Sequence, residues 1–214
     1  MNEIVDLSGK RILLVGSTGV LGRVYASSLA KKGANLVIAD REQSDVLSYA
    51  QQLDVSGTIV DVSSEESVID CINYCSEKLG GLDGVINNAA ATGEGLMESG
   101  EVFSEFESYP LNVWEKTINI NLTGTFLVAR EVGRLMKASN TNGSLVNVSS
   151  IYGVVGPDHR IYEGQPFKSF PGYSASKAGV IGLTKWLATK YAKNGIRITT
   201  TASGTRNNSS GNYR

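Results

Sequence analysis

Three glycines stand at equal spacing in the stretch LLVGSTGVLGR: Gly16, Gly19 and Gly22. The first permits a tight turn, the second lets the backbone approach a pyrophosphate, and the third allows a helix to pack closely on a strand. A helix that begins after such a turn offers free N–H groups and partial positive charge to phosphates. The pattern therefore predicts a dinucleotide site in the first strand–helix turn.

An acidic residue follows this turn at the distance that a dinucleotide site needs. Asp40 ends the next apolar run, 18 residues beyond Gly22. A carboxylate there can accept hydrogen bonds from the adenosine ribose hydroxyls and would repel a 2′-phosphate. We therefore expect NAD rather than NADP as the cofactor. Arg41 is the feature that could instead accommodate the extra phosphate of NADP.

Two tyrosine–lysine pairs have the same spacing of four residues: Tyr173 with Lys177, and Tyr74 with Lys78. Four residues is about one helical turn, so each pair would share one face of a helix. Either pair could be reactive, and either could be ordinary helix surface. The choice depends on what the rest of the chain brings to the same place.

Short apolar runs alternate with longer amphipathic stretches along the chain. The runs are continuously apolar, which suits parallel strands buried on both faces under helices. Alternating units of this kind indicate a three-layer α/β architecture, a doubly wound parallel β-sheet or Rossmann fold, formed by one domain over residues 1–214. The expected strands are 11–16, 35–40, 57–62, 82–90, 143–150 and 195–203, and the expected helices are 20–32, 42–53, 64–79, 111–138 and 173–193.

Composition narrows the function classes. The 214 residues include 20 basic and 21 acidic side chains, and a net charge of −1 gives no electrostatic reason to bind nucleic acid or an anionic membrane. No signal peptide is recognisable, and no window reaches the roughly 18 apolar residues of a membrane span, so we expect a cytoplasmic protein. Cys71 and Cys75 have no nearby histidine and predict half-buried thiols rather than a metal site.

Five motifs in one order resemble the short-chain dehydrogenase/reductase family, and the resemblance runs from about residue 9 to 204. It implies an NAD(P)(H)-dependent oxidoreductase that interconverts a secondary alcohol and a carbonyl, with hydride moving to or from nicotinamide C4. Two alternatives remain open: a dinucleotide-binding regulator without turnover, and a sugar-nucleotide epimerase or dehydratase. The motifs are GSTGVLG at 16–22, NNAA at 87–90, NINLTG at 119–124, VNVSS at 146–150 and YSASK at 173–177.

The resemblance favours Tyr173 over Tyr74 and implies four catalytic residues. Tyr173 would be the general acid/base, and Lys177 would lower its pKa from about 10 and bind the nicotinamide ribose. Ser150 would hold and polarise the substrate oxygen. The bland alternative is represented by its neighbour Ser149, a serine at a strand end that only makes a hydrogen bond to the backbone. Asn121 would hold a water in a proton relay with Lys177, or would only kink its helix.

The resemblance also implies the cofactor contacts. The third strand would end beside the adenine, and the fourth would lead to the nicotinamide ribose. In the first turn the family usually has threonine where this chain has Val15, so one hydrogen bond to the Asn-Asn-Ala segment would be lost or replaced. The expected cofactor-binding residues are Gly16, Ser17, Gly19, Val20, Leu21, Gly22, Asp40, Arg41, Asp61, Val62, Asn88, Ala89, Ala90, Tyr173 and Lys177.

The segment between Ser150 and Tyr173 is longer than the family's usual spacing, and it should lie over the substrate. Its mixed polar groups, among them His159, suit a hydroxylated substrate such as a sugar derivative. We expect His159 to be a loop contact rather than a base, because Tyr173 already fills that role. The acidic stretch 92–109 is expected to be solvated.

Two further expectations concern assembly and the end of the chain. Ala175, Gly179 and Gly182 predict a small-residue strip where a partner helix could approach, in a homodimer or homotetramer. The ten residues after Gly204 contain no apolar run. We therefore expect the family's C-terminal strand and lid to be missing from this sequence, and the natural protein to be longer.

Overall fold

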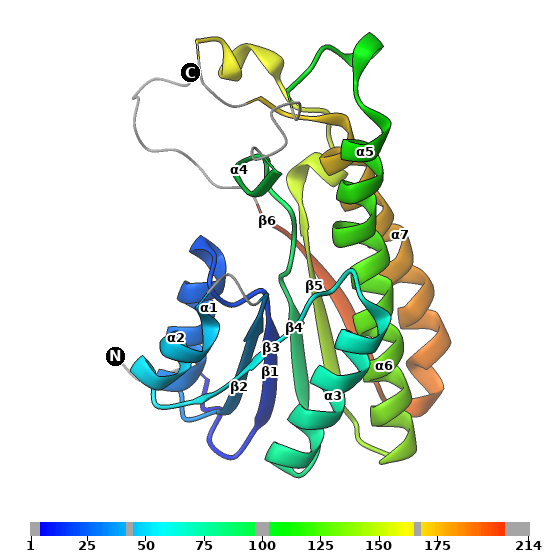
Figure 1. The fold of residues 1–214 in the computed structure, drawn as a ribbon. Helices are drawn as coiled ribbons and strands as arrows, with labels where there is room; N and C mark the ends of the chain where they lie inside the picture. Colours follow the sequence, from blue (N-terminus) through cyan, green and yellow to red (C-terminus); the bar gives the residue numbers. More distant parts are fainter. Residues whose placement is uncertain (1–4, 42–44, 97–102, 165–167, 204–214) are drawn as a thin grey trace.

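Figure 1 shows the computed structural model, which describes residues 5–41, 45–96, 103–164 and 168–203. Six parallel strands form one sheet in the order β3-β2-β1-β4-β5-β6. This confirms the predicted doubly wound parallel sheet. The strands are β1 (Arg11–Val15), β2 (Asn35–Asp40), β3 (Ser56–Ile59), β4 (Gly84–Asn87), β5 (Ser144–Ser150) and β6 (Arg197–Ser203).

Helices cover the two faces of the sheet. Figure 1 shows α1 (Val20–Lys31) and α2 (Val46–Gln52) on one face, and α3 (Glu65–Leu79), α6 (Gly124–Ala138) and α7 (Pro171–Tyr191) on the other. Each face buries its own apolar cluster, because alternate strand residues point to opposite sides. Leu14 and Ile38 face α1 and α2, whereas Leu13 and Val37 face the second layer.

The expected helix 111–138 consists of three parts. It begins as α5 (Leu111–Ile118), widens into the π-helical turn η4 (Asn119–Thr123), and continues as α6. A π turn holds one residue more than the regular ladder can pair, so it interrupts the helix without ending it. The buried residue of this turn is Asn121.

A third apolar cluster lies apart from the two sheet faces. Buried Leu96, at the end of α4 (Gly93–Leu96), packs with Val113 of α5 and with Phe170, which precedes α7. Phe103 and Tyr173 pack against these residues at their edge. This cluster fixes the loops that follow β4 and β5 relative to the start of α7.

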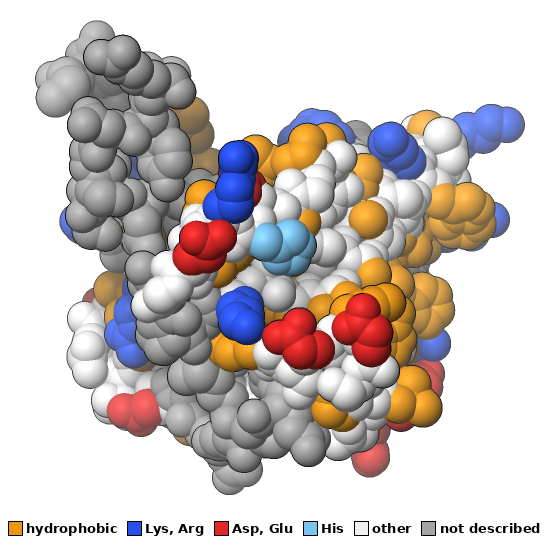
Figure 2. All heavy atoms as spheres, turned by 90° about the horizontal axis from the view of Figure 1, so that it is seen from above, with side chains coloured by type: hydrophobic (Ala, Val, Ile, Leu, Met, Phe, Trp, Pro, Cys, Tyr) orange, Lys and Arg blue, Asp and Glu red, His pale blue; other side chains and the backbone are white. Residues whose placement is uncertain are grey.

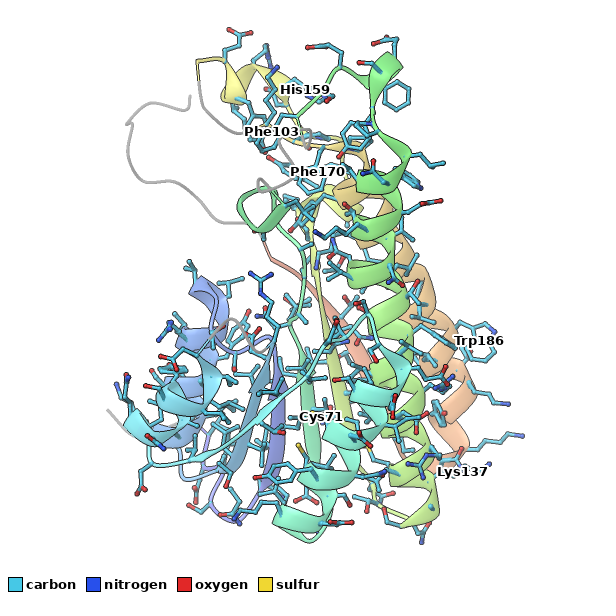
Figure 3. All side chains as sticks on the ribbon, in the orientation of Figure 1. Cys71, Phe103, Lys137, His159, Phe170 and Trp186 are labelled. Atoms are coloured by element: carbon cyan, nitrogen blue, oxygen red, sulfur yellow. The ribbon has the colours of Figure 1, made fainter. Side chains whose placement is uncertain are left out.

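Several smaller expectations can be compared with the structure. Tyr74 and Lys78 lie exposed on α3, as predicted. Cys71 and Cys75 are free thiols that are buried completely rather than by half, because α3 turns them into the core; Figure 3 labels Cys71. The expectation about the residues after Gly204 falls outside the described ranges, and the single domain over 1–214 stays a prediction.

No helix among the described residues is long and apolar enough to cross a membrane. Within the same ranges, acidic, histidine and cysteine side chains form no group of three or more that could hold a metal ion.

Candidate functional site

The glycine turn is tightly packed, and its glycines allow this. Gly16 has φ of +78°, and its N–H donates to the carbonyl oxygen of Ala39 at 2.8 Å. A Cβ on Gly16 would collide with the backbone of Ala89, and one on Gly22 would collide with the turn itself. Glycine at position 16 therefore lets the turn pack against the loop after β4, and glycine at position 22 lets α1 pack against the turn.

Helix α1 begins at this turn with its N-terminus open. Gly19 is the N-cap, and its position has no side-chain cap for the first helical N–H groups. Nothing lies within 4 Å of the place where a Cβ of Gly19 would stand. Free N–H groups facing open space fit a pyrophosphate, since phosphates bind at helix N-termini.

Asp40 lies at the carboxyl end of β2 and faces the same turn. One of its carboxylate oxygens accepts hydrogen bonds from the backbone N–H and the hydroxyl of Thr18, at 2.8 and 2.7 Å. The other accepts from the N–H of Arg41 at 2.8 Å. The carboxylate is thereby oriented at the edge of the glycine turn.

A cleft of about 730 Å³ runs from the glycine turn to the start of α7. Most of the predicted cofactor-binding residues line it. Ser17 and Gly22 do not, because the hydroxyl of buried Ser17 donates to the carbonyl oxygen of Ala39 at 3.2 Å and Gly22 is covered by the turn. The predicted residues on the cleft wall are Gly16, Gly19, Val20, Leu21, Asp40, Arg41, Asp61, Val62, Asn88, Ala89, Ala90, Tyr173 and Lys177.

Two expectations about the strands beside this cleft need adjustment. Asp61 and Val62 follow β3 rather than end it, because the strand stops at Ile59. Valine in the first turn loses no connection to the Asn-Asn-Ala segment: the N–H of Asn88 donates to the carbonyl oxygen of Val15 at 2.9 Å, and its side-chain amide donates to that of Gly16 at 2.6 Å. The first turn and the Asn-Asn-Ala segment are therefore connected through backbone atoms and the Asn88 side chain, without a hydroxyl at position 15.

The structure brings Ser150, Tyr173 and Lys177 together on the other wall of the cleft. Ser150 is the last residue of β5, and Tyr173 and Lys177 lie on the first turns of α7. Lys177 is 3% exposed; its Nζ donates to the carbonyl oxygen of Val148 at 2.9 Å and lies 5.7 Å from the centre of the Tyr173 ring. Ser149 donates to the carbonyl oxygen of Lys177 at 2.8 Å and so makes the strand-end backbone bond foreseen for it.

Burial changes the pKa values of both Lys177 and Tyr173. It lowers the pKa of Lys177 to about 8, because the charged form is desolvated. Burial also raises the pKa of Tyr173, outweighing a hydrogen bond with Ser150 that lowers it. The expected lowering of the Tyr173 pKa by Lys177 is not found, because desolvation of the buried phenol is the larger effect.

Asn121 holds the π turn against the loop after β4. Its side-chain oxygen accepts from the N–H of Ala91 at 2.7 Å, and its amide donates to the Ser176 hydroxyl at 3.1 Å. Ser176 in turn donates to the carbonyl oxygen of Tyr173 at 2.8 Å. Asn121 therefore connects the interrupted helix, the loop after β4 and the helix that carries Tyr173 and Lys177.

The long segment after Ser150 lies over this end of the molecule. It contains the short helices η5 (Ile151–Gly153) and η6 (His159–Tyr162). Figure 3 shows His159, Phe103 and Phe170 near one another at the top, and Figure 2 looks down on His159, the chain's one histidine, among acidic and basic side chains.

Beside this segment lies a second cavity of about 660 Å³. Its wall is aromatic as well as polar: the ring of Phe170 lies 6.4 Å from that of Phe103 and 5.7 Å from that of Tyr173. The predicted mixed polar rim is thus only part of this surface. In the acidic stretch, Glu105 and Glu107 are exposed, as predicted.

Comparison with known proteins agrees with this arrangement. The family model of the short chain dehydrogenases matches residues 10–210. The chain is a member of the short-chain dehydrogenase/reductase family. The family implies a nicotinamide dinucleotide as cofactor and a small molecule as substrate.

Curated relatives of this chain are named as dehydrogenases and reductases. It is 34% identical over 196 residues to 2,5-dichloro-2,5-cyclohexadiene-1,4-diol dehydrogenase of Sphingobium indicum, covering 90% of the chain and 71% of the relative. It is 33% identical to levodione reductase of Leifsonia aquatica, covering 90% and 68%. It is 32% identical to trans-4-hydroxycyclohexanecarboxylate dehydrogenase of Sinomonas cyclohexanicum, covering 92% and 73%.

Solved structures show the same fold. A short chain dehydrogenase from Mycobacterium smegmatis superposes with a TM-score of 0.78 at 26% identity, covering 92% of this chain and 78% of the other. Levodione reductase superposes with a TM-score of 0.73 at 32% identity, covering 92% and 71%.

Sequence reasoning missed several residues that line the cleft. Thr18 binds Asp40, and Arg23 donates from Nε to the carbonyl oxygen of Thr18 at 2.8 Å while stacking on Tyr49. Tyr152 lines the other end, two residues after Ser150. The positions of Thr18 and Tyr152 beside recognised motifs were available signals. No signal in the sequence pointed to Arg23, because the orientation of its side chain depends on packing against Tyr49 of α2.

Proposed function

We propose that this protein interconverts a secondary alcohol and a ketone on a small carbon ring, with NAD(H) as the cofactor. One observation carries the proposal: Ser150, Tyr173 and Lys177 lie on the same cleft as the open N-terminus of α1 and Asp40. A dinucleotide laid from the glycine turn along this cleft would end beside the tyrosine.

Each side chain has a distinct part in the proposed reaction. The hydroxyl of Ser150 holds the substrate oxygen, and Tyr173 gives it a proton in reduction or takes one from it in oxidation. Lys177, charged below its pKa of about 8, binds the nicotinamide ribose. Asn121 fixes the loop after β4 and holds the relay water. The bound dinucleotide supplies or accepts the hydride.

The names of the relatives support a ring substrate. Two of these names describe a six-membered carbon ring with oxygen-containing groups at positions 1 and 4: the cyclohexadiene-1,4-diol and the 4-hydroxycyclohexanecarboxylate. Phe170 beside Tyr173, with Phe103 next to Phe170, suits such a ring better than the heavily hydroxylated surface of a sugar. We therefore replace the sugar derivative expected from the sequence with a cyclic alcohol or ketone.

The direct test is turnover. Purified protein is incubated with NAD⁺ and cyclohexanol or cyclohexane-1,4-diol, and with NADH and cyclohexanone, while absorbance of the reduced nicotinamide is followed. We expect turnover of at least one pair. Binding of NADH without turnover of any ring alcohol or ketone would instead favour the alternative of a dinucleotide-binding regulator.

Preference for NAD is proposed from Asp40, whose carboxylate lies where a 2′-phosphate would be repelled. We expect Asp40→Ser to shift the NAD/NADP ratio of kcat/KM toward NADP by about tenfold or more, because about 1.4 kcal/mol of lost repulsion is a factor of ten. Better kcat/KM with NADP in the unchanged protein would show that Arg23 and Arg41, which line the same end of the cleft, govern the pocket.

We also propose a homo-oligomer that pairs through α7. Ala175, Ala178 and Gly182 form an exposed strip on this helix, and Figure 3 shows Trp186 pointing outward from it. Gly179 was predicted to belong to this strip, but it faces its own chain: a Cβ there would lie 2.7 Å from the side chain of Leu122. Light scattering at micromolar concentration tests this, and a monomer would refute it.

A further inference from the structure

The short helix η5 presents a second tyrosine to the cleft, close to Tyr173. Tyr152 lines the same cleft as Ser150 and Tyr173. Its N–H donates to the Ser150 hydroxyl at 3.2 Å, so its backbone is tied to the serine. It is also near enough to raise the pKa of Tyr173 electrostatically.

The backbone of η5 has little freedom to move. Gly153 packs directly on α7, where a Cβ would stand 2.7 Å from the carbonyl carbon of Lys177. Ser149 donates to the carbonyl oxygen of Lys177 on the same side. Tyr152 is therefore held in fixed relation to both Ser150 and the start of α7.

The side chain of Tyr152 is fixed by the long segment. The hydroxyl of Tyr162, at the end of η6, donates to the hydroxyl of Tyr152 at 2.7 Å. Tyr162 lines the aromatic cavity while Tyr152 lines the cleft, so the two phenols together form the boundary between the two spaces. A phenol has one hydrogen to donate. Because the Tyr152 hydroxyl accepts a hydrogen bond from Tyr162, its own hydrogen can be donated to another oxygen.

We propose that Tyr152, oriented by Tyr162, binds a second oxygen on the ring substrate, distinct from the oxygen that is oxidised or reduced. The assignment rests on the proposed function, in which Ser150 and Tyr173 already hold the reacting oxygen. A third donor on the same wall therefore serves another acceptor. The preferred substrate class is a ring with two oxygen functions, because a site built to pair a polar group discriminates against an analogue that lacks it.

The test compares cyclohexane-1,4-diol with cyclohexanol as substrates. We expect the unchanged protein to prefer the diol, and Tyr152→Phe to lower kcat/KM for the diol about 5- to 10-fold, the worth of one neutral hydrogen bond, while changing that for cyclohexanol less than twofold. Tyr162→Phe should lower kcat/KM for the diol about threefold, through KM rather than kcat, as a positioning residue would. Tyr74→Phe is the matched control and should change neither.

The outcomes separate this assignment from the proposed function. Turnover with the same diol-to-cyclohexanol ratio in the unchanged protein and in Tyr152→Phe would overturn the second-oxygen site alone. Equal losses for both substrates would also overturn it, since they would place Tyr152 at the reacting oxygen. Absence of turnover of either substrate by the unchanged protein would overturn the proposed function and the site together.

Discussion

Helices α3 and α7 each carry a tyrosine and a lysine four residues apart, but they place them in opposite surroundings. On α3, Tyr74 is 39% exposed and Lys78 is exposed. On α7, Lys177 is 3% exposed, and burial lowers its pKa to about 8. The same spacing thus produces a solvated helix surface in one place and a desolvated pair in the other.

The difference comes from the elements that cover each helix. The start of α7 lies against the end of β5 and against η5, which accepts no side chain at Gly153. These neighbours exclude water from Lys177 and bring Ser150 beside Tyr173. Spacing on a helix therefore provides a shared face, and only the packed neighbours change the chemistry of the groups on it.

Removing the tyrosine hydroxyl tests this comparison most strongly. We expect Tyr173→Phe to lower kcat by about 10²- to 10⁴-fold, the usual contribution of general acid–base catalysis. NADH binding, followed by nicotinamide fluorescence, should remain within about twofold, since only the proton-transfer group is lost. Tyr74→Phe should leave both unchanged. Equal losses in the two variants would contradict the assignment of Tyr173.

Exposing the buried pair should make α7 behave more like α3. Gly153→Ala places a methyl group against the backbone of Lys177 and must displace η5, so we expect the free energy of unfolding to fall by about 1–3 kcal/mol. Turnover should fall as well. Gly156→Ala in the same segment is the control, because nothing lies within 4 Å of its added Cβ. A Gly153→Ala protein as stable and active as the control would show that η5 does not enclose Lys177.

The lowered pKa of Lys177 predicts a stability that depends on pH. Between about pH 8, the folded pKa, and about 10.5, the unfolded value, the unfolded chain binds more protons at this site, so stability rises with pH. By pH 9.5 the gain over pH 7 should reach about 2 kcal/mol. Urea unfolding at both pH values should show this gain in the unchanged protein and in Lys78→Met but not in Lys177→Met. A gain of the same size in Lys177→Met would assign it to another group.

The smallest effect concerns the outer face of α7. In an isolated helix, Gly182→Ala would raise the free energy of unfolding by about 1 kcal/mol through helix propensity. If the proposed oligomer pairs through this face, the added methyl group should instead weaken association, seen as a lower mass by light scattering at low concentration. Lys78→Ala on α3 should leave the mass unchanged. A more stable Gly182→Ala protein of unchanged mass would place the interface elsewhere.

Much of this arrangement could be predicted from the sequence, because its signals are local. Continuous apolar runs give buried parallel strands, and Gly16 is required by a backbone conformation that few other residues adopt. The meeting of Ser150 with Tyr173 followed from motifs that the fold must bring to one sheet edge. These predictions needed residue type and order but no side-chain packing.

What could not be predicted depends on contacts between distant side chains. Nothing local in the sequence shows that the Ser17 hydroxyl turns to Ala39 or that Gly179 packs on Leu122. The pKa of Tyr173 was expected to fall through the charge of Lys177, but it rises because desolvation is the larger effect. The phenol pair of Tyr152 and Tyr162 lies ten residues apart in a segment without periodicity, so only the folded chain reveals it.

The π-helical turn between α5 and α6 allows the number of residues in the helix to change without changing which faces of α5 and α6 are buried. A π turn accommodates one additional residue while the helix on either side keeps its register. Deleting a single residue from Asn119–Thr123 could therefore close the turn into regular α-helix, with the buried faces of α5 and α6 retained. The widened turn that directs Asn121 to Ala91 would be lost. The additional residue of this turn therefore serves to position Asn121, and the packing of α5 and α6 does not require it.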